Sequence, residues 1–179
     1  ALTWLNRTFK YTHGYAWKKL CFTWSLNTHQ MMFSPDVDQD TRVHMHRGVS
    51  DAVRRIAPWL RYDRDPYAVI SDGRIKWIQD AYTVSSYYPY SAYYNGDLED
   101  YAGINYIAGA VKVVIDAYDG SVDFYLLDHE DPVIQTFENA FPSLFKPASV
   151  MPPEIRAHLR YPEDLFTIQM EMYGTYQMR

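Results

Sequence analysis

Two aspartates, Asp80 and Asp116, are the residues of this chain best placed to do chemistry, because each occupies the same position in a repeated pattern. Segments 75–82 and 111–118 both contain a lysine that is followed four residues later by Asp-Ala-Tyr. Two carboxylates about 5 Å apart, or somewhat wider, suit acid and base catalysis on a glycoside. The alternative is structural, since aspartates often accept hydrogen bonds at strand ends or shape turns.

Tyrosines form the second group of candidate residues. A flat apolar ring with a polar tip suits sugar or peptide surfaces, and it also suits packing over a sheet or an aromatic layer between domains or subunits. The cluster comprises Tyr82, Tyr87, Tyr88, Tyr90, Tyr93 and Tyr94. As ligand-binding residues we select Tyr82, Tyr87, Tyr88 and Tyr90 from it, together with Tyr118 from the second repeat.

Two further patterns suggest metal ligands but do not complete a site. Acidic residues alternate over residues 36–40, as at the start of a calcium loop, but Thr41 stands where that loop needs glycine and Arg47 where it needs glutamate. His44 and His46 are two residues apart, so in a strand they would lie on one face. The sequence lacks the cysteine pair or the His-Glu-x-x-His helix that would support a zinc site. We therefore expect no metal and no cofactor.

Composition excludes several classes of function. The 179 residues carry a net charge of -5, which gives no basic surface for nucleic acid. Cys21 is the single cysteine, so an intrachain disulfide is impossible. No apolar run reaches the about 20 residues that a membrane-spanning helix needs. Nucleophile elbows, phosphate loops and dinucleotide fingerprints are also missing from the sequence.

The elements around the repeats predict how these residues are positioned. Asp72-Gly73 and Asp119-Gly120 are dipeptides typical of tight hairpin turns. They predict one hairpin from strands 67–71 and 74–82, and a second from strands 111–118 and 122–127. A tyrosine-rich connection is expected at residues 83–101. The repeat therefore indicates a sheet of at least four strands.

Helical spacing precedes and follows these strands. Apolar residues recur at helical intervals over residues 17–26, and again over residues 49–56 before Pro58. Towards the C-terminus we expect helices at residues 132–141, 153–159 and from Pro162 onwards. The prediction is one α+β domain over residues 1–179, with an antiparallel sheet built on two Asp-Gly hairpins and helices before it and at the C-terminal end.

Several longer strings of residues resemble a known family. They include residues 57–67, Tyr88-Pro89-Tyr90-Ser91, Phe141-Pro142-Ser143-Leu144-Phe145 and residues 158–166. In this order they are similar to the uncharacterised protein family 0182, a group of large prokaryotic membrane proteins. The resemblance covers most of residues 19–178. A further family-like motif at residues 11–15 lies closer to residues 20–22 than the resemblance leads us to expect, which leaves the continuity of residues 1–16 with the rest open.

The resemblance implies a parent protein with several transmembrane helices near its N-terminus, followed by a large soluble region outside the cytoplasm that includes this chain. It brings no established activity and no catalytic residues. We expect a noncatalytic binding or assembly module whose partner is the membrane portion of the same protein, or a second copy. The alternative is a cell-envelope hydrolase acting on polysaccharide, with Asp80 or Asp116 as acid or base.

Overall fold

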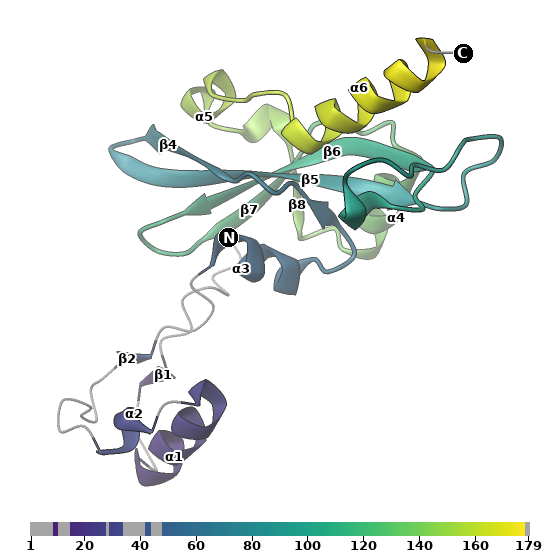
Figure 1. The fold of residues 1–179 in the computed structure, drawn as a ribbon. Helices are drawn as coiled ribbons and strands as arrows, with labels where there is room; N and C mark the ends of the chain where they lie inside the picture. Colours follow the sequence, from purple (N-terminus) through teal and green to yellow (C-terminus); the bar gives the residue numbers. More distant parts are fainter. Residues whose placement is uncertain (1–8, 11–14, 28, 34–41, 44–47, 178–179) are drawn as a thin grey trace. The chain divides into compact units, whose positions relative to one another are not determined.

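The structure, a computed structural model, describes residues 9–10, 15–27, 29–33, 42–43 and 48–177 (Figure 1). The chain divides into two compact units, one formed by residues 6–45 and the other by residues 1–5 and 46–179. The acidic residues 36–40, His44 and His46 lie outside the described residues. The single-domain interpretation, with its open question at residues 1–16, stays a prediction.

The unit of residues 6–45 contains two helices and a small antiparallel sheet. Its elements are β1 (Phe9–Lys10), α1 (Tyr15–Leu26), α2 (Gln30–Phe33) and β2 (Arg42–Val43). The helical spacing predicted for residues 17–26 is confirmed by α1. That helix is followed by Asn27, whose φ of 49° is the left-handed conformation common just after a helix.

The larger unit is built on a six-stranded sheet of order β3-β5-β6-β7-β8, with β4 also pairing with β5. The strands are β3 (Arg61–Tyr62), β4 (Tyr67–Ser71), β5 (Arg74–Ser85), β6 (Tyr106–Asp116), β7 (Val122–Leu126) and β8 (Phe145–Pro147). All pairs are antiparallel except β7 with β8, which is parallel. The α+β class is confirmed, and the sheet is mixed rather than purely antiparallel.

The two Asp-Gly dipeptides form different connections. Asp72 and Gly73 alone join β4 to β5, and both have positive φ (53° and 70°), as a two-residue hairpin turn requires. Between β6 and β7 the connection is longer, and only Gly120 has positive φ, at 70°. The tight turn expected at Asp119-Gly120 is therefore replaced by a wider loop.

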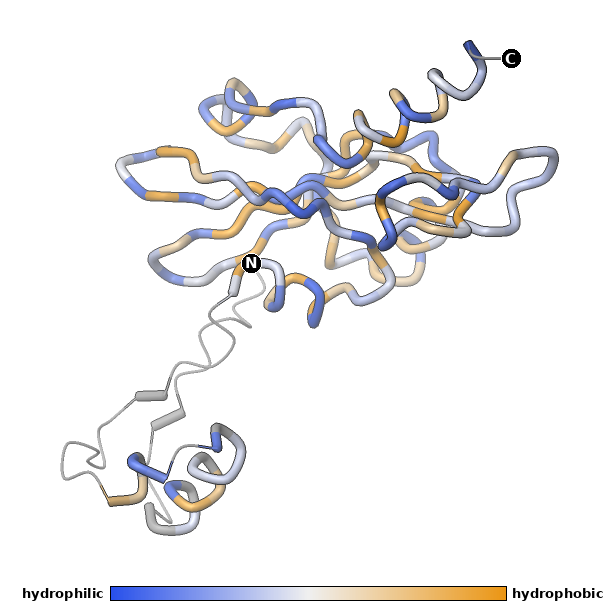
Figure 2. Tube along the Cα trace, viewed as in Figure 1, coloured by the Kyte–Doolittle hydropathy of each residue, from blue (hydrophilic) through white to orange (hydrophobic). Residues whose placement is uncertain are grey.

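Strands β5 and β6 are longer than the sequence pattern predicted. A register shift between Ala81 and Thr83 introduces a bulge, after which the ladder continues to the pair Ser85 and Tyr106. The tyrosine-rich connection thus begins after Ser85 and not at Thr83. Figure 2 shows the apolar stretches of the larger unit following the strands of this sheet.

Helices cover both faces of the sheet, as Figure 1 shows. They are α3 (Val49–Ile56), α4 (Pro132–Ala140), α5 (Pro153–Ala157) and α6 (Glu163–Gln177), with short 3₁₀ helices at Glu99–Tyr101 and Ala148–Val150. One apolar core joins Val53 of α3 and Ile134 of α4 to the sheet. On the other face, Ile155 of α5 and Leu165 of α6 belong to two further clusters. The helices expected at residues 49–56, 132–141, 153–159 and from Pro162 are confirmed, with ends shifted by one or two residues.

Candidate functional site

The repeated segments lie side by side in the sheet, in opposite directions. In the β5–β6 register, Lys76 pairs with Asp116 and Asp80 pairs with Lys112. Each aspartate of the repeat therefore faces the lysine of the other copy. Because directly opposed residues of an antiparallel pair point to the same face of the sheet, all four side chains share one face. The repeat thus provides alternating charges across two central strands.

This register does not bring Asp80 and Asp116 together. Their positions differ by four residues along the ladder, which corresponds to about 13 Å at about 3.3 Å per residue. A retaining glycosidase holds its carboxyl groups about 5 Å apart and an inverting one about 6.5–9.5 Å apart. The register therefore does not support the hypothesis that the two carboxylates act as a catalytic pair, because antiparallel pairing of the repeats opposes aspartate to lysine.

Asp80 and Lys112 form an ion pair inside the protein. Only 4% of Asp80 and 3% of Lys112 is exposed. The ammonium group of Lys112 contacts Asp80 Oδ1 and donates a hydrogen bond of 2.7 Å to the carbonyl oxygen of Arg160. Burial raises the pKa of the Asp80 carboxyl, while the charge and hydrogen bond of Lys112 act in the opposite direction. The pair links the sheet to the segment that leads into α6.

Asp116 shapes the loop that follows β6. Its Oδ1 accepts hydrogen bonds from the backbone N–H groups of Tyr118 (2.8 Å) and Asp119 (3.3 Å). Its other oxygen lies 3.5 Å from the guanidinium of Arg74. This is the turn-forming role of aspartate that the sequence left open as the alternative to catalysis.

Two further aspartates, which the sequence analysis did not select, complete a buried polar cluster. Asp63 follows β3, and both of its carboxylate oxygens accept hydrogen bonds, from the Tyr82 hydroxyl and from the N–H groups of Asp65 and Asp164. Asp164 accepts from the Tyr101 hydroxyl at 3.1 Å. Both aspartates are 2% exposed. The acidic first turn of α6 was the only sequence signal for Asp164, and nothing local marked Asp63.

The cluster also contains Arg64, whose backbone N–H and Nε donate to the Asp164 carboxylate at 3.1 and 2.9 Å. Burial, and next the hydrogen bond to Asp63, raises the pKa of Tyr82; burial and the charge of Asp164 do the same for Tyr101. Both phenols therefore stay protonated and keep donating. Buried carboxylates whose oxygens all accept hydrogen bonds within the protein stabilise the fold. We therefore interpret this cluster as structural and not as a substrate-binding site.

The predicted ligand-binding tyrosines do not form one site. Tyr82 is fully buried in the core, whereas Tyr87 (93% exposed), Tyr88 and Tyr90 (108%) lie in the connection that follows β5. Tyr118 is also exposed, but it lies with Arg74 at the other end of β5. Of the remaining cluster members, Tyr94 is buried and Tyr93 is exposed.

Five of these residues, Tyr87, Tyr88, Tyr90, Tyr93 and Tyr94, belong to a segment that we call the tyrosine loop, residues 86–96. Hydrogen bonds from Asn105 fix its backbone: the side-chain amide donates to Tyr88 O (2.7 Å) and accepts from Tyr88 N–H (3.0 Å). The Ser91 hydroxyl donates to the carbonyl oxygen of Asn105 at 2.8 Å. The Tyr88 ring stacks on Tyr106 with centroids 5.0 Å apart. The loop is thus held at two points against the start of β6.

The exposed part of the tyrosine loop has two unusual properties. No residue from 83 to 96 is charged. Tyr90 has a φ of 60°, a left-handed conformation that is strained for a residue other than glycine and that persists only where surrounding contacts impose it. The contacts of Asn105 to both sides of Tyr90 supply that constraint. The loop therefore presents neutral rings on a preorganised backbone.

Asn105→Ala is expected to loosen the tyrosine loop without unfolding the protein. The substitution removes both side-chain hydrogen bonds to Tyr88, so amide hydrogen exchange at Tyr88 should accelerate by about tenfold or more. The free energy of unfolding should fall by only about 1 kcal/mol, because these groups are exposed to water. Exchange measured by NMR tests this, with the exposed Asn95→Ala of the same loop as control. Equal exchange at Tyr88 in the two variants would contradict the role of Asn105.

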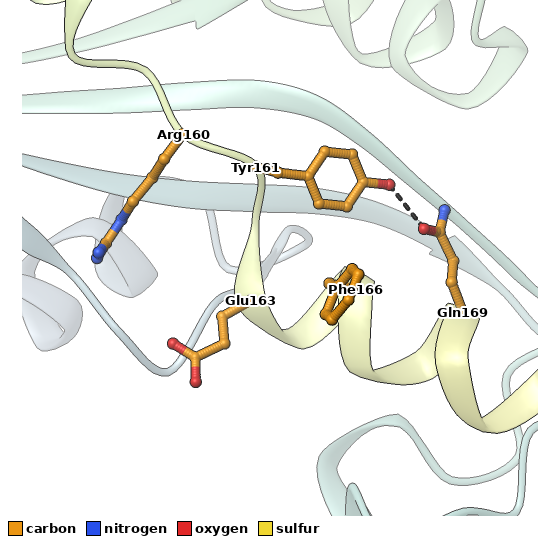
Figure 3. Close-up of a pocket in the computed structure, with 5 residues that line it drawn as sticks. All are labelled: Arg160, Tyr161, Glu163, Phe166 and Gln169. Carbon is orange, nitrogen blue, oxygen red and sulfur yellow. Dashed lines mark hydrogen bonds between the residues drawn. The ribbon is translucent and has the colours of Figure 1, made fainter.

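A shallow groove of about 660 Å³ lies beside the start of α6 (Figure 3). It is lined by Arg160, Tyr161, Glu163, Phe166 and Gln169. A smaller hollow of about 160 Å³ lies between α3 and the Glu99–Tyr101 turn, lined by Arg54, Pro58, Leu60, Arg61, Tyr62, Asp100 and Tyr101. Neither of these two hollows is lined by Asp80, Asp116 or the tyrosine loop.

Among the described residues, no three histidine, cysteine, aspartate or glutamate side chains come together as ligands for a metal ion. No helix in that part of the chain combines the length and apolarity needed to cross a membrane.

Comparison with known proteins places residues 15–179 in a match to the model of the uncharacterised protein family UPF0182. The chain is 47% identical over 161 residues to a UPF0182 protein of Cupriavidus necator, and 50% identical over 162 residues to one of Bradyrhizobium diazoefficiens. Each match covers 90% of this chain and 17% of the relative. A UPF0182 protein of Methanospirillum hungatei is 42% identical over 89% of the chain and 18% of its own length. No solved structure matches.

Proposed function

We propose that this chain, which belongs to the UPF0182 family, is a noncatalytic binding or assembly module of a membrane protein, in a region outside the cytoplasm. The similarity of its motifs to large membrane proteins supports the membrane and the location. The chain spans about 17–18% of the length of the relatives described above, which is consistent with a module of a larger polypeptide. As partner we propose the membrane portion of the same protein.

The observation that carries this function is the tyrosine loop. Exposed tyrosines on a fixed backbone lose little conformational entropy on binding, and they combine apolar area with a hydroxyl group, which is why binding loops of antibodies are rich in tyrosine and serine. In this loop Tyr87 and Tyr90 are almost completely exposed, and Asn105 fixes the backbone between them. Its uncharged character favours a partner surface that is also uncharged.

The shape of the loop favours a protein partner. In Figure 1 the connection between β5 and β6 projects beyond the end of the sheet. A projecting loop inserts into a concave protein surface, as long binding loops of single-domain antibodies do, whereas a small ligand needs a pocket that encloses it. The two grooves described above are not lined by the exposed rings of this loop. Asp80 and Asp116 are engaged in an internal ion pair and a turn, which disfavours the hydrolase alternative.

The test removes the exposed rings of Tyr87 and Tyr90 and keeps the contacts that hold the tyrosine loop in place. Tyr87→Ser combined with Tyr90→Gly leaves Tyr88, its stacking partner Tyr106 and Asn105 in place, and glycine accepts the φ of residue 90. We expect the free energy of unfolding to change by less than about 1 kcal/mol. Co-purification of the chain with the separately expressed remainder of the longer polypeptide should weaken by about tenfold or more.

Tyr118→Ser is the matched control, because Tyr118 is similarly exposed but lies at the opposite end of β5. It should leave co-purification unchanged. If the loop variant retained the partner as well as the control did, the loop would have no binding role. If light scattering instead showed that the unaltered chain self-associates and that the loop variant is monomeric, the partner would be a second copy.

A further inference from the structure

The last helix of the chain has apolar side chains on two faces. Leu165 and Ile168 are buried against the core, with Met172 packed partly against them. Four other large residues of the same helix are each more than half exposed: Phe166, Met170, Tyr173 and Tyr176. We call these four the outer face of α6. A helix that is apolar around much of its circumference is typical of a segment surrounded by other parts of a protein.

The charges of α6 leave its outer face neutral. Asp164 points into the buried cluster with Arg64 and Tyr101. Glu171 accepts a hydrogen bond from the hydroxyl of Tyr94, which belongs to the tyrosine loop. Glu163, at the first position, is the other charged residue in the described helix. From Phe166 onwards, Glu171 is therefore the one charged residue of the described helix.

The groove at the start of α6 continues this face. Figure 3 shows the Phe166 ring beside Tyr161, while Arg160 and Glu163 point away from it. Two polar groups of the groove already have partners: the Tyr161 hydroxyl donates to Gln169 at 2.8 Å, and the Arg160 guanidinium binds Asp65 and stacks on Tyr67. The apolar part of the groove consists of the rings of Tyr161 and Phe166, which pack edge to face with centroids 6.5 Å apart. Such a lining suits a bulky apolar side chain rather than a polar ligand.

We infer that the outer face of α6 and its groove are the docking site for an apolar segment of the same longer polypeptide, outside residues 1–179. This inference rests on the proposed function and names a second contact surface for it. The relatives extend far beyond the matched region, which is 17–18% of their length, so most of such a polypeptide lies elsewhere. Contiguous exposed apolar patches are rare on isolated proteins and mark surfaces that another element covers. The hydrogen bond between Tyr94 and Glu171 joins this surface to the tyrosine loop.

Site-specific photo-crosslinking in the full-length polypeptide in cells tests the docking site. A benzophenone amino acid replaces Tyr173, and in separate proteins it replaces Tyr90 or Tyr118. We expect crosslinks from position 173 to a segment of the same polypeptide outside residues 1–179. Crosslinks only to a second copy, or none, would overturn the inference. Crosslinks from position 90 without any from position 173 would leave the proposed function standing and remove the α6 site alone. Crosslinks from position 173 without any from position 90 would keep the α6 site and remove the tyrosine loop as a contact surface.

A charge introduced on the outer face provides the second measurement. Met170→Glu should reduce the crosslinking yield from position 173 by about tenfold, because an unpaired carboxylate opposes burial of the surface. The melting temperature of the 179-residue chain should move by less than about 2 °C, since Met170 is exposed there. Ile70→Glu places the same charge at an exposed residue of β4 and should leave the yield unchanged. Equal yields in both variants would contradict docking on α6.

Discussion

Replacing Lys112 by methionine is expected to lower the free energy of unfolding by about 3–5 kcal/mol, because removal of one partner leaves a buried charge uncompensated. Lys112 and Asp80 are both almost fully buried, and Lys112 also satisfies the carbonyl oxygen of Arg160. Methionine keeps most of the volume and flexibility of the lysine stem, so packing is largely preserved. Urea denaturation followed by tryptophan fluorescence at neutral pH measures the effect.

The double variant Lys112→Met with Asp80→Asn separates loss of charge balance from loss of packing. An asparagine at position 80 carries no charge, so the double variant should recover a large part of the loss. A coupling energy of about 2 kcal/mol or more is expected for this pair. A loss below about 1 kcal/mol for Lys112→Met, or simple additivity of the two substitutions, would show that the buried pair contributes little.

The pH dependence of the Lys112→Met variant follows from the pKa of Asp80. Burial raises this pKa above its ordinary value in the folded protein, and Lys112 opposes the shift. A raised carboxyl pKa favours folding below the unfolded-state pKa, and this contribution is lost as the pH rises through the folded-state value. Without Lys112 the shift is larger. The destabilisation of Lys112→Met should therefore be smallest near about pH 4 and should grow towards pH 7.

The parts of the fold that could be predicted from sequence have local causes. Asp72-Gly73 forms a two-residue turn because both residues accept positive φ. Helix α4 begins where expected because Asp131 accepts hydrogen bonds from the N–H groups of Val133 and Ile134, with proline at the first position. The turn and the helix start are each decided by residues close together in the chain, so composition and spacing suffice.

The candidate site depended on distant contacts and was predicted only in part. Recognition of the repeat selected Asp80, but its partner follows from the register between β5 and β6, which lie on either side of a long connection. Tyr82 and Tyr87 have the same side chain and opposite surroundings, because the strand ends at Ser85. Asn105 and Tyr88 are 17 residues apart in the sequence, so no local pattern predicts the hydrogen bonds between them.

Asp63 illustrates the most distant of these contacts, and its removal is the second large effect that we expect. Its carboxylate accepts from Tyr82 of β5 and from the N–H of Asp164, which is 101 residues away in the first turn of α6. The N–H groups of a helix's first turn have no partner within the helix, and a negative charge there also interacts favourably with the helix dipole. Asp63 therefore caps α6 from another part of the chain.

Asp63→Ala should lower the free energy of unfolding by about 3–5 kcal/mol, because it leaves the buried Tyr82 hydroxyl and the Asp164 N–H without an acceptor. Amide exchange in the first turn of α6 should accelerate more than exchange in β6, since the cap is lost while the central ladder stays intact. Denaturation and exchange mass spectrometry measure the two effects.

Asp65→Ala is the matched control, from the same segment of the chain. The Asp65 carboxylate pairs with Arg160 at 2.7 Å, but the two side chains are 53% and 50% exposed, so water screens the pair and the loss should stay below about 1 kcal/mol. If Asp63→Ala were no more destabilising than Asp65→Ala, the buried cluster would not be what attaches α6 to the sheet. If stability fell but exchange in α6 did not change relative to β6, the loss would come from the Tyr82 hydroxyl alone. The inference of a docking site on α6 requires this attachment, because a helix that detaches from the sheet cannot present its outer face in a fixed orientation.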